Sequence, residues 1–283
     1  MAFKAHLAQI TPVLGEVKRN LDLHLEAIDA AIAAGAHLIV FPELSLTGYF
    51  LRDLVPDVAL RLESPILAEL AKRSAGLGIV AGFVEETPDF DFHVSAAYFE
   101  RGQLRHVHRK IYLPTYGMFD EERYFGAGHT LRAFDTALGR TAMVICEELW
   151  HPSLVCLASC DRMQQLIAIA NSPARGAKGD RPSSAETYAR MLSVYAELFQ
   201  VHVLFCNRVG CEEGVTFWGG SAVVGPDGQT IAQAPYLEEA QLAAEIDLGL
   251  VRRERARTQL LSEERLDLTL RELQRIVRER FGA

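Results

Sequence analysis

The sequence predicts an α/β fold in which mixed β-sheets are covered by helices. Two observations support this prediction. Short apolar runs of β type alternate with stretches whose apolar residues recur at helical spacing. Other strand-like runs are joined as hairpins, as at Pro226-Asp227-Gly228, which favours mixed rather than purely parallel pairing. The number of strands fits two sheets within one domain.

The first half of the chain contains two predicted helices among five strands. The first helix has an apolar stripe at i, i+4, i+7 and i+11, formed by Leu21, Leu25, Ile28 and Ile32. Gly35 suits the end of this helix. Ser64 followed by Pro65 resembles an N-cap and first helical residue, so a second helix is expected to begin there. The expected strands are 3–10, 36–41, 78–85, 94–100 and 104–108.

The second half repeats this alternation and ends in a charged helical segment. Ser183 followed by Glu186 is a capping-box pattern, which predicts a helix start. The apolar stripe behind it consists of Tyr188, Leu192, Tyr195 and Phe199. The expected strands are 141–146, 165–170, 202–207, 221–224, 230–233 and 242–246. We therefore expect one domain over residues 1–283, with a helical extension from about residue 250.

Composition and charge narrow the class of protein. The 283 residues are 49% hydrophobic and 23% charged, as in ordinary globular proteins, and the formal net charge is −8. This acidic balance argues against nucleic acid or an anionic membrane as a partner. The apolar runs are far shorter than the roughly 20 residues that cross a bilayer, and the N-terminus lacks the apolar core of a secretory signal. Five cysteines, an odd number at low density, fit a reducing cytoplasm rather than a disulfide framework.

Three strand ends carry side chains that could perform chemistry. Cys146 ends one apolar strand, Glu43 follows another, and Lys110 leads from a third into an apolar stretch. Each has a structural interpretation as well: a small buried thiol, a solvated loop glutamate, and a lysine whose stem lies on apolar surface. Together they form a nucleophile, a base and a cation that could stabilise an oxyanion. That combination suits acyl transfer through a thioester.

The three motifs resemble those of the nitrilase superfamily of carbon–nitrogen hydrolases, which use a Glu–Lys–Cys triad in this order and at this spacing. Segments 41–49, 110–125 and 146–150 look like the glutaminase domains of glutamine-dependent NAD synthetases, and so do 171–174 and 219–221. The resemblance covers residues 3 to about 250. It implies an α-β-β-α sandwich of the nitrilase type, two mixed sheets flanked by helices. It also implies a homo-oligomer and chemistry without a metal or organic cofactor.

The resemblance also implies roles for individual residues. Glu43 would be the general base, Cys146 the nucleophile, and Lys110 an oxyanion stabiliser beside the backbone N–H of Glu147. Glu121 fits the place of a second glutamate that supports the site, although an exposed loop carboxylate is the alternative. The residues expected to hold substrate are Tyr116, Phe119, Glu147, Ser172 and Arg175, with Glu147 facing an α-ammonium and Arg175 a carboxylate. Tyr116 and Phe119 could instead simply pack in the core.

The expected activity is hydrolysis of a small-molecule amide with release of ammonia, and glutamine is the first choice of substrate. There is no Walker A or Gly-x-Gly-x-x-Gly run. The ammonia would therefore pass to a separate NAD synthetase. One alternative is a free-standing amidase acting on an ω-amide, an N-carbamoyl amine or a nitrile. Another is a non-catalytic subunit that binds a partner. His106 and His108 share a strand face, but no third ligand indicates a metal site.

Overall fold

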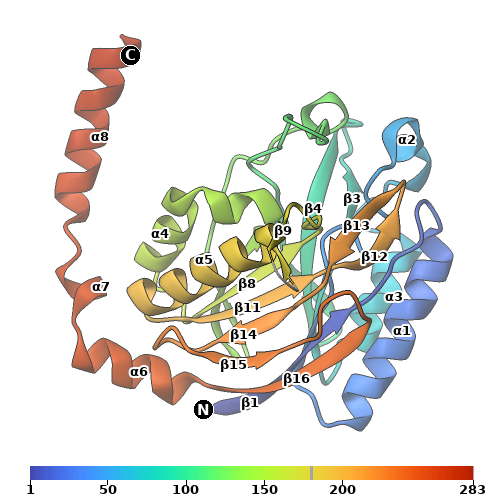
Figure 1. Cartoon of the computed structure of the whole chain (residues 1–283), viewed down its shortest axis with the longest axis horizontal. Coiled ribbons are helices and arrows are strands. Elements are labelled where there is room, and N and C mark those ends of the chain that lie inside the picture. The colour runs from blue at the N-terminus through green and yellow to red at the C-terminus, as the bar shows by residue number, and fades with distance from the viewer. Residues whose placement is uncertain (179–180, 283) are drawn as a thin grey trace.

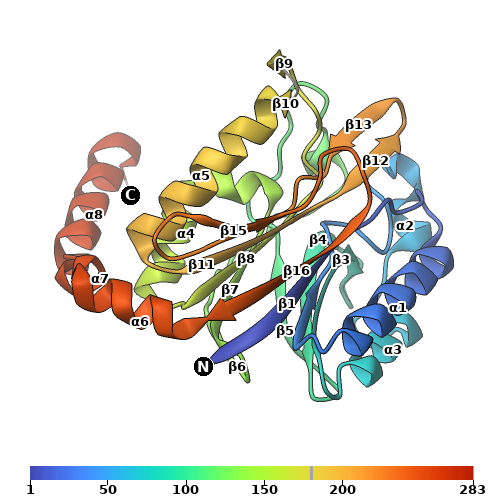
Figure 2. The ribbon, with the colours of Figure 1, turned by 60° about the horizontal axis from the view of Figure 1, so that its bottom comes forward.

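Two six-stranded sheets pack face to face, and helices cover the outer face of each (Figure 1). This computed structural model describes residues 1–178 and 181–282. Figure 2 shows the four layers from a second direction, with α1 (Val17–Ala33) and α3 (Pro65–Arg73) on one side and α4 (Pro152–Cys160) and α5 (Ser183–Phe199) on the other. The α-β-β-α sandwich expected from the sequence is confirmed.

The first sheet joins the two ends of the domain. Its order is β16 (Ala240–Asp247), β1 (Ala2–Gln9), β2 (Leu38–Val40), β3 (Gly78–Glu86), β4 (Phe92–Glu100) and β5 (Gln103–Arg109). The pairs β1–β2 and β2–β3 are parallel and the others are antiparallel. Leu38 and Val40 on β2 face the core between the sheets, whereas Ile39 faces the helices. Such a strand is buried on both faces, which explains its continuous apolar sequence.

The second sheet has the same size and the same mixed character. Its order is β15 (Thr230–Gln233), β14 (Ala222–Val224), β11 (His202–Asn207), β8 (Gln165–Ala170), β7 (Gly139–Ile145) and β6 (Phe134–Thr136). The central pairs β11–β8 and β8–β7 are parallel. Two small hairpins stand beside it, β9 (Ala177–Lys178) with β10 (Arg181–Pro182) and β12 (Val209–Glu212) with β13 (Val215–Trp218).

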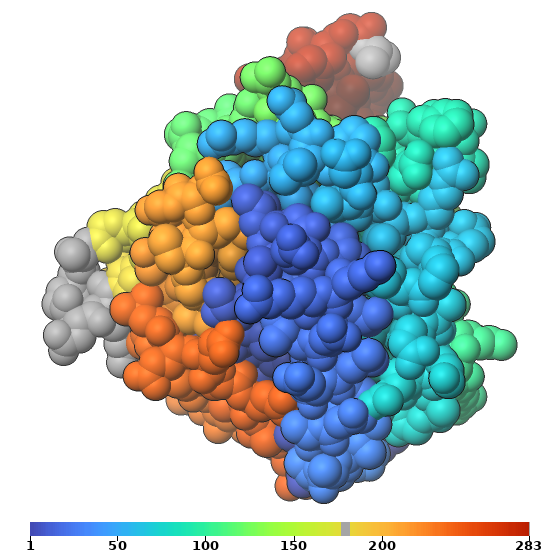
Figure 3. Space-filling view, turned by 90° about the vertical axis from the view of Figure 1, so that its right-hand side faces the viewer, coloured from blue at the N-terminus to red at the C-terminus, as the bar shows by residue number. Residues whose placement is uncertain are grey.

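The hairpin of β12 and β13 fastens the N-terminal segment to the second half of the chain. Figure 3 shows this orange hairpin packed against the blue N-terminal residues. Buried Arg208 donates to the carbonyl of Pro12 and pairs with Glu212 at 2.7 Å. Glu212 Oε1 in turn accepts from the backbone N–H groups of Tyr49 and Phe50, at 2.9 and 2.7 Å. A buried ion pair therefore holds the loop that follows β2.

The start of α5 differs from the predicted capping box. Pro182 occupies the N-cap position, no side chain caps the helix, and Ser183 is the first helical residue. The reason is that residues 181 and 182 pair with β9 in extended conformation, so the helix begins only after Pro182. Ser184 serves another purpose, because its hydroxyl donates to the carbonyl of Pro173 and accepts from the N–H of Arg175. The predicted N-cap at Ser64 is confirmed, since its Oγ accepts from the N–H of Leu67.

The C-terminal helices behave in two ways. Helix α6 (Leu248–Arg257) lies against the body, where Val251 is buried and Arg255 donates to the carbonyl of Met163. After the short α7 (Leu260–Glu263), helix α8 (Leu266–Phe281) projects away from the body (Figures 1 and 2). None of the residues of α8 is buried. The short helices η1 (Arg52–Leu54), α2 (Val55–Val58), η2 (Glu121–Arg123) and η3 (Cys146–Trp150) complete the described elements.

Candidate active site

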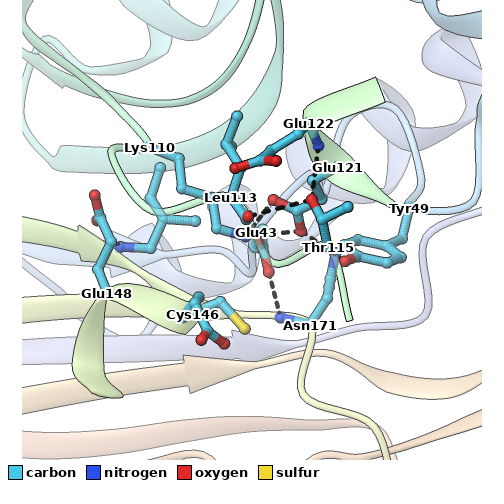
Figure 4. Close-up of polar contacts among 12 residues, drawn as sticks. Glu43, Tyr49, Lys110, Leu113, Thr115, Glu121, Glu122, Cys146, Glu148 and Asn171 are labelled. Atoms are coloured by element: carbon cyan, nitrogen blue, oxygen red, sulfur yellow. Dashed lines mark hydrogen bonds and ion pairs between the residues drawn. The ribbon is translucent and has the colours of Figure 1, made fainter. Parts of the chain in front are cut away.

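Four strand ends meet at one end of the sandwich. Glu43 lies in the loop after β2, Lys110 directly follows β5, Cys146 directly follows β7, and Asn171 directly follows β8. Glu121 reaches the same place from the start of η2. The structure thus brings together the four residues that the sequence predicts as catalytic, two strand ends coming from each sheet (Figure 4).

Lys110 is the centre of a buried ion network. Its Nζ lies 2.7 Å from Glu43 Oε1 and 2.8 Å from both carboxylate oxygens of Glu121. Glu43 Oε2 accepts from the backbone N–H of Asn171 at 2.8 Å, and the Tyr49 hydroxyl donates to Glu121 at 2.6 Å. The Lys110 and Glu43 side chains are fully buried. The predicted alternatives of a snorkelling lysine, a solvated Glu43 and an exposed Glu121 are therefore wrong.

When all three groups are ionised, this buried network of one ammonium and two carboxylates carries one negative charge in excess. Burial would lower the pKa of Lys110, but the carboxylates of Glu121 and Glu43 raise it above its usual value, so the lysine stays charged. Burial raises the pKa of Glu121 to about 7, although the adjacent Lys110 opposes the rise. Glu121 is thus the carboxyl of this network that can take up a proton near neutral pH.

Cys146 is the first residue of η3 and stands at the strained turn that directly follows β7. Its backbone φ is +49°, a left-handed conformation that costs a non-glycine residue about 1–3 kcal/mol. Burial raises the pKa of the Cys146 thiol, and the negative charge of Glu43 adds to the rise. Its Sγ lies 3.6 Å from the Tyr188 hydroxyl. Cys146 is therefore a thiol at rest, and to act as a nucleophile it would need a base at the moment of attack.

A small cavity of about 50 Å³ opens on Cys146. Tyr116, half exposed at its mouth, donates to the Glu147 carboxylate, with oxygens at 2.8 and 3.0 Å. The Arg175 guanidinium lies 4.6 Å from the centre of the Phe119 ring. The predicted substrate-binding residues all line this cavity: Tyr116, Phe119, Glu147, Ser172 and Arg175. The core-packing alternative is wrong for Tyr116, whereas Phe119 does pack partly against the core.

Sequence reasoning missed several residues of the site. Tyr188 was predicted only as part of a core stripe, yet its hydroxyl is near Cys146 and accepts from the Trp150 indole N–H at 3.3 Å. Trp218 donates to the Ser172 hydroxyl at 3.0 Å. Asn171 and Tyr49 lie within motifs that the sequence singled out, but their contacts had no local signal. Across residues 1–178 and 181–282, no group of three or more His, Cys, Asp or Glu side chains could hold a metal ion.

Comparison with known protein families adds an independent finding. The sequence model of the family described as carbon–nitrogen hydrolase matches residues 4–256. A glutamine-dependent NAD(+) synthetase from Thermotoga maritima is 35% identical over 245 residues, covering 86% of this chain and 42% of the relative. An N-carbamoylputrescine amidase from Arabidopsis thaliana is 25% identical over 271 residues, 89% of each chain. The chain spans less than half the length of the NAD synthetases that it matches.

Solved structures agree with the fold. The glutamine-dependent NAD+ synthetase from Acinetobacter baumannii, in complex with ADP, matches with a TM-score of 0.79 and 29% identity, covering 89% of this chain and 47% of that one. A carbon–nitrogen hydrolase from Helicobacter pylori G27 matches with a TM-score of 0.84 and 22% identity, covering 96% and 99%. The second likeness supports the architecture alone.

Proposed function

The chain belongs to the carbon–nitrogen hydrolase family, whose members act on non-peptide C–N bonds, and we propose that it hydrolyses the side-chain amide of glutamine with release of ammonia. The observation that carries the proposal is the buried Lys110 ammonium, held between Glu43 and Glu121 beside the Cys146 thiol. This cluster supplies a nucleophile, a base and a fixed cation in a site largely shielded from water.

The first half of the reaction forms a thioester. Glu43 takes the thiol proton as Cys146 Sγ bonds to the amide carbon, and the carbonyl oxygen becomes an oxyanion. Lys110 Nζ and the backbone N–H of Glu147 hold that oxyanion. When the tetrahedral intermediate collapses, the C–N bond breaks and the proton on Glu43 passes to the departing nitrogen, which leaves as ammonia. The raised pKa of the Cys146 thiol explains why the base must act together with the attack.

The second half regenerates the enzyme. Glu43 removes a proton from water, whose oxygen bonds to the thioester carbon. The C–S bond then breaks, glutamate leaves, and Cys146 recovers a proton from Glu43. Glu43 is oriented for both steps because one oxygen contacts Lys110 and the other accepts from the N–H of Asn171. Glu121 would be the fourth member of the catalytic set, since it holds Lys110 Nζ by a second carboxylate contact beside that of Glu43.

The mouth of the cavity suits an amino acid with both charges. Glu147 would attract the α-ammonium of glutamine, and Arg175 would meet its carboxylate. The Tyr116 hydroxyl orients the Glu147 carboxylate, while Phe119 stacks under the Arg175 guanidinium. Ser172 lines the inner wall, where Trp218 fixes its hydroxyl. These two opposite charges are the feature that favours glutamine over an amide without an α-amino acid group.

A separate NAD synthetase is the proposed acceptor of the ammonia. The support is that the relatives at 35% and 30% identity are glutamine-dependent NAD(+) synthetases. The second candidate is a free-standing amidase acting on an ω-amide, an N-carbamoyl amine or a nitrile. N-carbamoylputrescine amidases from plants favour it, because they match this chain over 89% of their own length. A non-catalytic partner-binding subunit is disfavoured because every group of the proposed chemistry is present.

The test is a panel of substrates followed by ammonia release, with Cys146→Ala as the blank. The panel contains glutamine, ω-amides, N-carbamoylputrescine and aliphatic nitriles, each with and without a short NAD synthetase supplied with ATP. We expect glutamine to react fastest and the synthetase to increase its turnover. Ammonia from N-carbamoylputrescine but none from glutamine, with or without the synthetase, would replace the first candidate by the second.

The same proposal includes a homo-oligomer in the cytoplasm, built from one domain with a helical extension from about residue 250. Helix α8 supports the oligomer because its apolar residues are exposed on their own subunit: Leu266, Leu268, Leu270, Leu273, Ile276, Val277 and Phe281. A second copy of the chain would cover that face. In the part of the chain that the structure describes, no helix combines the length and the apolar character needed to cross a membrane.

A further inference from the structure

We propose that Glu148 is a positioning residue whose carboxylate locks the Lys110 and Cys146 segments to one another. This inference rests on the proposed amide hydrolysis, because it explains how the Cys146 thiol and the Lys110 ammonium are held in the correct relative position. Glu148 follows Glu147 in the chain, but it points inward and is fully buried, whereas Glu147 lies at the mouth of the cavity.

The carboxylate of Glu148 receives three hydrogen bonds. Oε1 accepts from the backbone N–H of Ile111 at 2.7 Å, and Oε2 accepts from the backbone N–H of Ile145 at 2.6 Å. Oε2 also lies 2.8 Å from Nε2 of His108. Ile111 follows Lys110 and Ile145 precedes Cys146, so one carboxylate holds the backbone next to both residues.

These bonds join the two sheets at the site. His108 lies on β5 of the first sheet, and Ile145 ends β7 of the second. The His108 and Glu148 side chains are at most 1% exposed, so water does not compete for the bonds. Hydrogen bonds to an ionised carboxylate are roughly twice as strong as neutral ones. A shift of one strand end would therefore pull the other with it.

The strained turn at Cys146 explains why the three hydrogen bonds to Glu148 are needed. Its left-handed φ is costly for cysteine, so neighbouring contacts must hold it. Glu148 does so by folding back onto the N–H of Ile145 across the first turn of η3. Only an ionised carboxylate can accept from three donors here, since the amide of glutamine would turn one of its own N–H groups toward them.

The decisive experiment compares Glu148→Gln with Glu100→Gln. Glu100 is a matched control because it is also buried, accepts from the N–H of Ala137 at 2.9 Å, and contacts the Tyr98 hydroxyl at 3.3 Å. It lies at the other end of the β4–β5 hairpin from Lys110. The readouts are melting temperature, kcat and KM for the best amide, and the rate at which iodoacetamide alkylates Cys146.

We expect both variants to have a lower melting temperature than the wild-type protein. Only Glu148→Gln should lose about 10²-fold in kcat, with KM changed less than threefold. Alkylation of Cys146 should slow by a similar factor in that variant alone. Equal kcat and alkylation rates in the two variants would reduce Glu148 to a structural role. If the wild-type protein hydrolyses no amide, the proposed function fails, but the alkylation comparison still decides the positioning role.

A second variant keeps the proposal testable if Glu148→Gln does not fold. His108→Leu removes one of the three partners, since leucine has no donor, and leaves the bonds from Ile111 and Ile145 in place. We expect kcat and the alkylation rate to fall severalfold at unchanged KM. Wild-type values for both in a folded His108→Leu protein would overturn the positioning role, because the link from Glu148 to β5 would then be dispensable.

Discussion

Charged side chains usually face water and apolar ones are usually buried. The proposed catalytic pocket departs from this rule by burying charges, and helix α8 departs from it by exposing apolar side chains. The pocket buries an ammonium and two carboxylates, whereas α8 leaves Leu270 59% and Phe281 74% exposed. In the pocket the violation is compensated within the chain, because each charge has a partner of opposite sign or a hydrogen bond. In α8 it is not compensated by the subunit itself. The first feature fits the chemistry proposed for a single subunit, and the second fits the proposed contact with another copy of the chain.

The largest effect is expected from removing the nucleophile. Cys146→Ala should reduce amide turnover by at least about 10⁴-fold, because no thioester can form, while the fold remains. Ammonia release and thermal melting would be measured together. Cys206→Ala is the control, since this thiol is also buried but lies away from the pocket, where it donates to the carbonyls of Ala8 and Val40. Comparable turnover in the two variants would show that Cys146 is not the nucleophile.

Removing the cation should break the compensation inside the pocket. Lys110→Met leaves Glu43 and Glu121 buried without a counter-charge, so we expect a loss of about 3–5 kcal/mol in the free energy of unfolding, together with activity. Adding Glu121→Gln to this variant should restore part of the stability but none of the activity. Urea unfolding of both variants measures this. A double variant no more stable than Lys110→Met would contradict the charge argument.

The excess carboxylate should be visible as a pH dependence of stability. The pKa of Glu121 is raised from 4.5 to about 7, so between these values the folded chain binds a proton that the unfolded chain has lost. This contribution to stability is therefore present below pH 4.5 and is lost as the pH rises to about 7. The free energy of unfolding of Glu121→Gln should lack that decline. Parallel curves for the two proteins from pH 4.5 to 7 would refute the assignment.

The smallest effect within one subunit is expected on α8. Leu270→Gln with Leu273→Gln should change the stability of an isolated subunit by less than about 0.5 kcal/mol, since both side chains are already exposed. The same variant should lower the mass of the assembly measured by light scattering at micromolar concentration. Arg271→Gln on the same helix serves as the control. An unchanged mass would mean that the oligomer, if formed, uses another surface.

The strands and the candidate residues near their ends left local signals in the sequence, whereas the sandwich was predicted only through the family resemblance that the motifs carry. The β2, β7 and β8 strands are apolar runs. Glu43 and Cys146 follow two of these runs, whereas Lys110 follows the polar strand β5 and begins an apolar stretch. The family match confirms the resemblance that these motifs suggested.

Contacts between distant segments had no such signal. Glu212 holds the N–H of Tyr49 across 163 positions of sequence, and Tyr188 meets Cys146 from a different layer. The predicted cap at Ser183 failed for a related reason, because pairing with β9 decides where α5 begins. Periodicity and capping describe neighbours along the chain, so they cannot reveal which partner arrives from elsewhere.

The left-handed turn at Cys146 has a consequence for the history of the protein. Glycine adopts this backbone conformation freely, so a chain selected for folding alone would gain by placing glycine there. A cysteine at this strained position is accounted for by the proposed reactivity of its sulfur and not by the stability of the fold. Libraries screened only for heat resistance are therefore expected to yield glycine at this position.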